Sequence, residues 1–173
     1  KAQRLAASEG LSDRITSRTG DGLGILTKDE ADTAVIAGMG GELIISILQT
    51  NMEKMPDTLV LSCHTSVDLL RGWLSDNGYY FEDEAIVEER GHFYPVMRVR
   101  RGHRPALTMA EREFGPVLLQ KKPEVMRRLI NKRIGKMKDI RERLEQSYSP
   151  RKAELLCDMD EMLMRYEEVR KNL

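Results

Sequence analysis

The segment Tyr79–Arg100 limits the possible folds of this chain more than any other feature. Two stretches that read as strands, Tyr79–Glu88 and Phe93–Arg100, are joined through Arg90-Gly91 by a link that is too short for a helix. Parallel strands need a crossover of a dozen or more residues, so these two must form an antiparallel hairpin. Before them, short apolar runs alternate with helical stretches, which is typical of a parallel α/β sheet. The sequence therefore predicts a parallel sheet that ends in an antiparallel hairpin.

The earlier elements follow from hydrophobic periodicity. Apolar residues share one face in each of two helical stretches, Glu42–Met52 and Val67–Asp76. Asn77-Gly78 supplies a left-handed stop after the second of them. We expect further strands at three apolar runs, Ile15–Arg18, Thr33–Ala37 and Thr58–Cys63.

After Gly102 the pattern becomes helical throughout. Thr108 and Glu111 have the spacing of a capping box, which predicts a short helix that ends near Phe114-Gly115-Pro116. Apolar residues then recur every three or four positions in two long stretches, one of them Glu124–Gln146. The two amphipathic helices should fold back on each other as a coiled-coil-like helical hairpin. We therefore divide the chain into two domains, 1–103 and 104–173.

The break between the two long helices has its own signals. Ser147 to Pro150 interrupts the apolar stripe. We expect Ser149 to cap the second helix and Pro150 to occupy its first position.

The charges are divided unevenly between these halves. Residues 1–103 hold 11 Lys and Arg against 16 Asp and Glu, whereas residues 104–173 hold 17 against 12. We expect a set of basic side chains on the first long helix to face solvent, and such a stripe favours a polyanion such as RNA. The alternative is a solvated helix face without a ligand. The set comprises Arg127, Arg128, Lys132, Arg133 and Lys136.

Other compositional signals exclude several classes of protein. The two cysteines, Cys63 and Cys157, lack the paired spacing of a zinc site or a disulfide framework, so reduced thiols and no metal are expected. No apolar run approaches the roughly 20 residues that a membrane span requires. We expect a cytosolic protein that does not enter a membrane.

Two glycine-containing turns are candidates for ligand binding. Ile36-Ala37-Gly38-Met39-Gly40-Gly41 lies directly after a strand and before a helix, at the sheet edge where open α/β sheets bind ligands. Gly20-Asp21-Gly22-Leu23 follows the run at Ile15, and its carboxylate and amides could hydrogen-bond an adenine. Either motif alone is also compatible with a tight turn of no further function.

Together with their surroundings these motifs resemble the TrmK family, the tRNA adenine-N1 methyltransferases that act on position 22. The similarity continues along the chain at several further positions. They are Leu70-Arg71 with Trp73-Leu74, Asn77-Gly78, Glu84, Glu88-Glu89, Tyr94, and Phe114-Gly115-Pro116 with Leu118-Leu119. The resemblance implies a partial class I Rossmann-like methyltransferase fold of the α/β class and S-adenosyl-L-methionine as the cofactor. It also implies tRNA as the partner.

The resemblance also implies roles for particular residues. Asp21 and Gly22 would lie at the adenine of the cofactor, and Gly38, Met39, Gly40 and Gly41 would line the floor between methyl donor and target base. Ser62-Cys63-His64 stands where relatives typically have a Gln-Pro-Asn-like tripeptide, and Cys63 and His64 are expected at the pocket for the target base. A Cys-His nucleophilic pair is disfavoured there, because adjacent strand residues point to opposite faces.

The resemblance further implies that this chain begins after the family's first acidic, glycine-rich turn. The strand expected at Ile15–Arg18 would then be two absent strands away from Thr33–Ala37, and the chain by itself should be inactive. Two other functions remain open. One is a class I methyltransferase with a different acceptor, and the other is a non-catalytic RNA-binding module whose helical hairpin carries the function.

Overall fold

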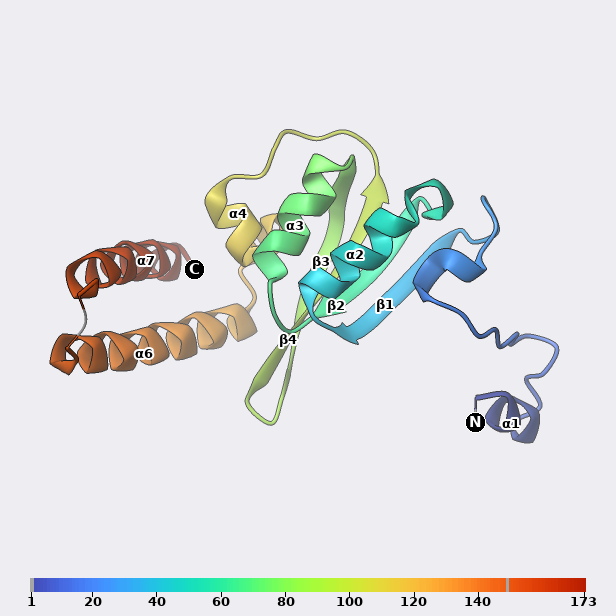
Figure 1. The fold of residues 1–173 in the computed structure, drawn as a ribbon, viewed down its shortest axis with the longest axis horizontal. Helices are drawn as coiled ribbons and strands as arrows, with labels where there is room; N and C mark the ends of the chain where they lie inside the picture. Colours follow the sequence, from blue (N-terminus) through green and yellow to red (C-terminus); the bar gives the residue numbers. More distant parts are fainter. Residues whose placement is uncertain (1, 149) are drawn as a thin grey trace.

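A four-stranded mixed sheet, covered on one face by two helices, continues into a pair of long helices beyond it (Figure 1). The computed structural model describes residues 2–148 and 150–173. In chain order the elements are α1 (Ala2–Ser8), the 3-10 turn η1 (Gly22–Ile25), β1 (Thr33–Met39), α2 (Gly41–Thr50), η2 (Met52–Lys54), β2 (Thr58–Cys63), α3 (Val67–Asp76), β3 (Tyr79–Glu89), β4 (His92–Arg101), α4 (Met109–Phe114), α5 (Pro116–Lys121), α6 (Glu124–Gln146) and α7 (Lys152–Asn172).

The sheet has the strand order β1-β2-β4-β3. β1 and β2 are parallel, and β4 runs antiparallel to both β2 and β3. At the tip of the β3–β4 hairpin, Arg90 and Gly91 have φ values of 48° and 75°. Two successive positive φ values are the backbone of a two-residue hairpin turn whose twist matches that of its strands. The predicted antiparallel hairpin is confirmed.

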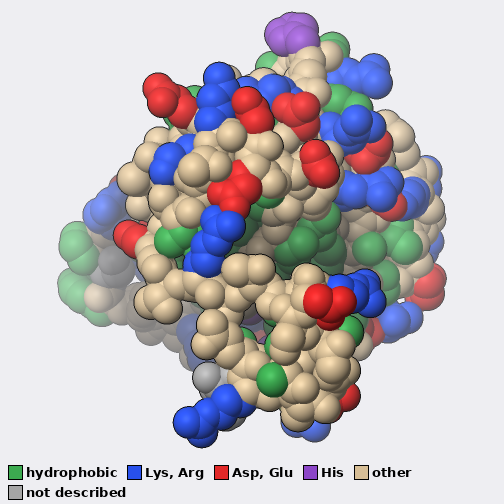
Figure 2. Space-filling view, turned by 90° about the vertical axis from the view of Figure 1, so that its right-hand side faces the viewer, with side chains coloured by type: hydrophobic (Ala, Val, Ile, Leu, Met, Phe, Trp, Pro, Cys, Tyr) green, Lys and Arg blue, Asp and Glu red, His purple; other side chains and the backbone are tan. Residues whose placement is uncertain are grey.

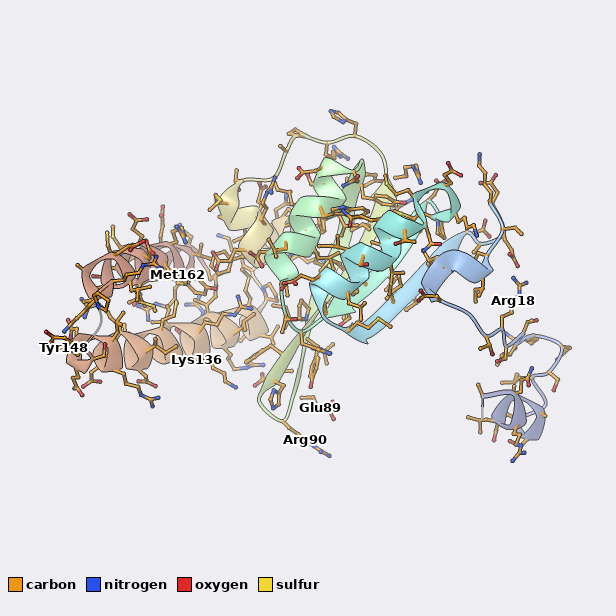
Figure 3. All side chains as sticks on the ribbon, in the orientation of Figure 1. Arg18, Glu89, Arg90, Lys136, Tyr148 and Met162 are labelled. Atoms are coloured by element: carbon orange, nitrogen blue, oxygen red, sulfur yellow. The ribbon has the colours of Figure 1, made fainter. Side chains whose placement is uncertain are left out.

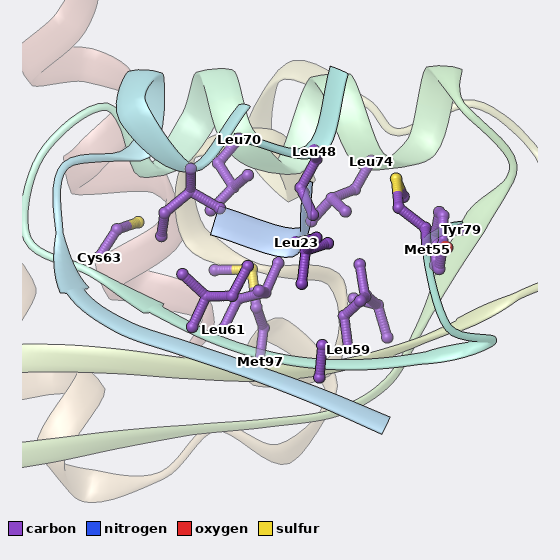
Figure 4. Close-up of a cluster of buried hydrophobic side chains, with 14 of the residues drawn as sticks. Leu23, Leu48, Met55, Leu59, Leu61, Cys63, Leu70, Leu74, Tyr79 and Met97 are labelled. Carbon is purple, nitrogen blue, oxygen red and sulfur yellow. The ribbon is translucent and has the colours of Figure 1, made fainter. Parts of the chain in front are cut away.

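The main core lies between the sheet and helices α2 and α3, which pack on the same face (Figures 1 and 4). Burying one leucine, isoleucine or valine side chain contributes about 1.5–3 kcal/mol to the free energy of unfolding, so this layer is a principal source of stability. On the opposite face of the sheet, Val35 is 71% exposed. The side chains with no exposed surface in this core are Ile44, Leu48, Leu59, Leu61, Cys63, Leu70, Leu74, Met97 and Val99.

The segment Ile15–Arg18 is not a strand, contrary to the sequence prediction. The amides of Arg14 and Ile15 donate to the carbonyl of Leu11, which continues the turn after α1. Arg18 instead forms an ion pair with Glu30. An apolar residue such as Ile15, which is 46% exposed, makes a strand only where a neighbouring strand offers a hydrogen-bonding edge.

Helices α6 and α7 form the antiparallel hairpin that the apolar periodicity predicts. Arg141 on α6 pairs with Asp160 on α7, and Lys138, one turn earlier on α6, pairs with Glu167, two turns later on α7. A pair that lies earlier on α6 thus lies later on α7, which requires the two helices to be antiparallel. Between them lies a second core of buried side chains that also includes residues of α4 and α5: Phe114, Leu118, Met126, Ile130, Ile134, Met137 and Tyr166.

Of two helix beginnings that the sequence predicts, one is confirmed and the other is not. The capping box of α4 forms as predicted, because Thr108 accepts from the amide of Glu111 while the Glu111 carboxylate accepts from the amide of Thr108. Helix α7, however, begins at Lys152 with Arg151 as its N-cap, so Pro150 lies in the preceding turn and not at the first helical position. The predicted cap Ser149 lies outside the described residues.

Within residues 2–148 and 150–173, none of the helices combines the length and the apolar composition that a bilayer span requires.

Candidate cofactor and nucleobase site

The turn between β1 and α2 contains the glycines that the sequence singles out. Gly38 has φ +80° and interrupts the register between β1 and β2, where Ala37 pairs with Ser62 and Met39 with Cys63. Such a bulge bends the strand at its carboxyl end. A side chain at Gly38 would meet no atom within 4 Å, so this backbone borders open space.

The other two glycines press against the turn that follows β2. The amide of Gly41 donates to the carbonyl oxygen of Thr65 at 2.9 Å, and a Cβ on Gly41 would lie 2.3 Å from the carbonyl oxygen of Ser66. A Cβ on Gly40 would lie 2.9 Å from Oγ1 of Thr65. Only glycine lets the two turns approach this closely. The β1–α2 and β2–α3 turns therefore form one rigid unit at the carboxyl edge of the sheet.

Cys63 and His64 belong to this unit but differ in exposure. Cys63 has no exposed surface and lies in the main core (Figure 4). Burial raises the pKa of its thiol to about 11, which keeps it protonated and a poor nucleophile. His64 is exposed, and its ring lies edge-on to Tyr94 at 5.8 Å between centroids and 87° between planes. Of the two residues, only His64 is accessible to a ligand.

Tyr94 is a residue of this edge to which the sequence analysis assigns no role. It lies on β4 two residues before Val96, which pairs with Ser62 of β2. Antiparallel pairing therefore brings the beginning of β4 to the edge where β2 ends. Periodicity alone identifies Tyr94 as a strand residue, and only the register of the hairpin brings it beside His64.

Asp21 and Gly22 lie on the side of α2, not at its beginning. A Cβ on Gly22 would lie 2.8 Å from Cγ2 of Ile47, and Leu23 is buried in the main core. Ile47 follows Gly41 by about 9 Å along the helix axis, given a rise of about 1.5 Å per residue. Asp21 is exposed, and although it precedes η1 its carboxylate makes no cap hydrogen bond. The carboxylate is therefore available to a ligand that extends along α2 from the glycine turn.

An ion pair holds the loop that carries Asp21. Arg18 and Glu30 are paired, and Glu30 also accepts from the amide of Thr27 at 2.8 Å. The hydrogen bond from Arg18 and the one from the Thr27 amide lower the pKa of Glu30 to about 2. The carboxylate therefore stays ionised over the physiological range, and the pair closes the loop from residue 18 to residue 30 around the Asp21-Gly22 turn.

The basic side chains of α6 are not all directed to solvent, which corrects the sequence expectation. Arg133 is partly buried and donates to the hydroxyl of Tyr166 at 3.0 Å. Arg128 and Lys132 are exposed but contact the β3–β4 hairpin, at the Glu88 carboxylate and the Gly91 carbonyl oxygen, at 2.8 and 2.6 Å. Because α6 packs across the hairpin, its basic residues meet acceptors there that helical periodicity cannot reveal.

The two remaining basic residues are less constrained. Arg127 is exposed and lies 3.7 Å from the carboxylate of Glu124 in an i,i+3 pair. Lys136 is exposed and projects from the side of α6 that faces away from α7, whereas Met162 lies between the two helices (Figure 3). These two side chains retain the surface exposure that contact with a polyanion requires.

Within the described part of the chain, no three His, Cys, Asp or Glu side chains gather into a group that could hold a metal ion.

The strand order and the glycine turn together define a class of protein. A sheet of order β1-β2-β4-β3, with a parallel pair, a terminal antiparallel hairpin and an open glycine backbone at its carboxyl edge, is a Rossmann-like fold of the class I methyltransferase type. The chain belongs to the TrmK family, whose model, described as tRNA (adenine(22)-N(1))-methyltransferase, matches residues 1–164. The resemblance in sequence is thereby confirmed.

Individual relatives agree with this assignment. A Bacillus subtilis tRNA (adenine(22)-N(1))-methyltransferase is 32% identical over 173 residues, which cover 94% of this chain and 73% of the relative. The crystal structure of the B. subtilis methyltransferase TrmK is 30% identical and superposes with a TM-score of 0.86, covering 98% of this chain and 76% of that one.

A relative has also been solved with a cofactor. This Streptococcus pneumoniae protein, described as a putative tRNA methyltransferase, was crystallised with S-adenosyl-L-methionine. It is 29% identical and has a TM-score of 0.79, and the alignment covers 98% of this chain and 74% of that one. The family is one of S-adenosylmethionine-dependent methyltransferases.

Proposed function

We propose that the protein transfers a methyl group from S-adenosyl-L-methionine to N1 of an adenine in tRNA, at position 22. The observation that carries this proposal is the glycine unit at the carboxyl edge of β1 and β2, in a chain whose residues 1–164 match the TrmK family. We further propose that residues 1–103 bind the cofactor and the target base in the cytoplasm, while residues 104–173 form the helical domain that binds RNA.

The residues of this edge fit the cofactor in two respects. The backbone at Gly38 borders open space, and the carboxylate of Asp21 is exposed without a cap hydrogen bond, so it can accept from an exocyclic amine. When bound, S-adenosyl-L-methionine supplies an electrophilic methyl group on a sulfonium centre. In this arrangement Asp21 and Gly22 contact the adenine, while Gly38, Met39, Gly40 and Gly41 line the floor beside the methyl group.

The chain's own contribution to the reaction is positioning. The β1–α2 and β2–α3 turns are held together by the hydrogen bond from the Gly41 amide to Thr65 and by the one that the Ser66 hydroxyl donates to Glu42 at 2.9 Å. A rigid floor keeps the acceptor nitrogen in line with the methyl group, and this orientation can contribute several kcal/mol to rate acceleration. No covalent protein nucleophile is required, which agrees with the protonated state of the buried Cys63 thiol.

The target adenine would bind against His64 and Tyr94. Aromatic side chains stack on bases that leave the helical stack, and such stacking contributes about 1–3 kcal/mol per base. His64 is exposed beside the glycine unit and Tyr94 braces it edge-on. Cys63 then supports the end of β2 from within the core and does not contact the base itself.

A methylation assay tests this proposal. Because residues 1–173 alone are expected to be inactive, the assay uses the protein together with the residues encoded before Lys1. It is incubated with tritiated S-adenosyl-L-methionine and a tRNA transcript with adenine at position 22, and primer extension locates the product because N1-methyladenine blocks reverse transcription. We expect incorporation and a stop at position 22, both lost when that base is guanine. Equal incorporation into the guanine transcript would indicate a different acceptor. Tight tRNA binding without methyl transfer, and without cofactor binding in calorimetry, would favour the non-catalytic RNA-binding module.

A further inference from the structure

A buried ion pair lies where the sheet meets the helical region. Arg71 on α3 and Glu84 on β3 are each 2% exposed, and the distance from Nε of Arg71 to Oε1 of Glu84 is 2.9 Å. Above them the chain passes from α4 to α5 through the single residue Gly115. Arg71 also lines a small pocket that includes His64, whereas Glu84 lies outside that pocket.

Each member of the pair binds the backbone of a different linker helix. Nη1 of Arg71 donates to the carbonyl oxygens of Arg112 and Glu113 at 3.1 and 2.9 Å, at the end of α4. Oε2 of Glu84 accepts from the amides of Val117 and Leu118 at 2.9 and 3.4 Å, at the beginning of α5.

One glycine makes this arrangement possible. Gly115 has φ +95°, a conformation that L side chains rarely adopt. A Cβ there would lie 2.5 Å from Oε2 of Glu84 and 2.8 Å from Nη2 of Arg71. The kink between α4 and α5 is therefore shaped directly around the two charged groups.

Exposed ion pairs flank the buried one. Arg112 on α4 lies 3.2 Å from Asp76 at the end of α3, and Lys121 on α5 pairs with Asp83 on β3. Surface pairs of this kind contribute little to stability or geometry. The buried pair differs because its hydrogen bonds are directional and an unpaired charge at that depth is costly.

We propose that Arg71 and Glu84 are positioning residues that fix the angle at which the α6–α7 hairpin leaves the sheet. Helix α6 follows α5 through Lys122 and Pro123, so the direction of α5 constrains the direction of α6. The exposed contacts of Arg128 and Lys132 with the β3–β4 hairpin act on α6 in addition. The buried pair thereby holds the basic side chains of α6 at a fixed distance from the Gly38–Gly41 turn. The basic side chains and the turn can then contact the same RNA molecule. The part of this inference that concerns RNA rests on the proposed function, whereas the geometric part is independent of it.

Pulsed electron paramagnetic resonance can measure this geometry. Spin labels are attached at exposed positions on α2 and α7 through Leu43→Cys and Met164→Cys, in a Cys157→Ser background that removes the exposed native thiol. We expect one narrow distance distribution in this background. Glu84→Gln, which keeps the side-chain shape but removes the charge, should broaden or split it while the helical content in circular dichroism stays unchanged. An unchanged narrow distribution in the folded Glu84→Gln protein would overturn the proposal.

Further variants separate positioning from a general loss of stability. Asp76→Asn and Asp83→Asn remove the exposed pairs, and the narrow distribution should persist in both. If Glu84→Gln does not fold, the double variant Arg71→Met with Glu84→Met replaces the pair by apolar side chains of similar length. It should fold and show the broad distribution, and a narrow one would again overturn the proposal.

Enzyme kinetics tests the link to RNA. In the Glu84→Gln protein, or in the double variant, KM for tRNA should rise several-fold while the affinity for S-adenosyl-L-methionine stays the same. An unchanged KM together with a broadened distance distribution would overturn the RNA part alone. If the unaltered protein methylates no tRNA, the proposed function fails while the distance measurements still decide the geometric part.

Discussion

At the scale of single residues, the glycines of the β1–α2 turn serve two different purposes. Gly41 is excluded from carrying a side chain by backbone atoms of the neighbouring turn, whereas Gly38 borders open space with a positive φ. Steric exclusion by fixed backbone is a structural requirement. Open space beside a glycine backbone at the carboxyl edge of a sheet instead indicates room for a ligand.

Alanine substitutions separate these purposes. Gly41→Ala should destabilise the protein by on the order of 2 kcal/mol or more, because the methyl group would force apart two packed turns. Gly38→Ala should cost only about 1–2 kcal/mol of backbone strain, yet it should abolish most cofactor binding because the new methyl group occupies the proposed site. Urea denaturation and calorimetry with S-adenosyl-L-methionine measure the two effects. Normal cofactor affinity in the Gly38→Ala protein would remove Gly38 from the site.

The two cysteines should differ sharply in reactivity. Cys63 is fully buried with a thiol pKa of about 11, and Cys157 is exposed on α7. At pH 8 only about one Cys63 thiol in a thousand would be ionised even if it were accessible. Ellman's reagent should therefore modify one thiol rapidly in the native protein and both after unfolding in guanidinium. Rapid modification of both in the native state would contradict the burial of Cys63.

At the scale of elements, α6 contains a glycine with no structural requirement for it. Gly135 lies in the interior of the helix and is exposed, and a Cβ there would meet no atom within 4 Å. Alanine is favoured over glycine in a helix interior by about 0.8–1 kcal/mol. Gly135→Ala should therefore raise the free energy of unfolding by about this amount, measured by urea denaturation. A decrease would mean that the helix is bent or contacted at this position.

How much could be predicted from the sequence depended on whether an element is specified locally. The β3–β4 hairpin and the α4 capping box were predicted correctly because a two-residue turn and a side-chain cap are local features. The strand predicted at Ile15–Arg18 was wrong, because a strand forms only where a neighbouring strand pairs with it. The beginning of α7 was placed too early, because Pro150 is as acceptable in the preceding turn as in a first helical turn.

The residues of the candidate site divide in the same way into those with a local sequence signal and those placed by distant contacts. The glycine cluster was recognisable because glycines at a strand end are a local signal. Tyr94 was recognisable only as a position that resembles the family. Its place beside His64 was not predictable, because only the register between β4 and β2 brings it to that edge. The hydrogen bonds of Arg71 to α4 likewise join residues 41 and 42 positions apart, a separation at which periodicity carries no information.

At the scale of the whole molecule, the charges are distributed by region. The side that carries the N-terminal segment presents acidic and basic side chains intermingled around a hollow lined by hydrophobic atoms (Figure 2). Residues 104–173 instead hold 17 Lys and Arg against 12 Asp and Glu. Helix α6 lies at the opposite end of the molecule from the N-terminal segment (Figure 1). A polyanion is therefore attracted toward the helical region and not toward the N-terminal side.

The salt dependence of tRNA binding tests this arrangement. Arg128, Lys132 and Arg133 have partners on other elements of the protein, whereas Arg127 has only the exposed i,i+3 pair with Glu124. The cleaner variant is therefore Arg127→Gln with Lys136→Gln. Each lost phosphate contact should flatten the log-log slope of affinity against salt by roughly 0.7–0.9, and tRNA affinity should fall. Lys138→Gln is the matched control, since Lys138 pairs with Glu167 on α7 and should not contribute to the slope. Cofactor affinity should be unchanged, because the proposed site lies at the carboxyl edge of the sheet. If the double variant keeps both the affinity and the slope of the unaltered protein, these residues form only a solvated helix face, and tRNA must bind elsewhere.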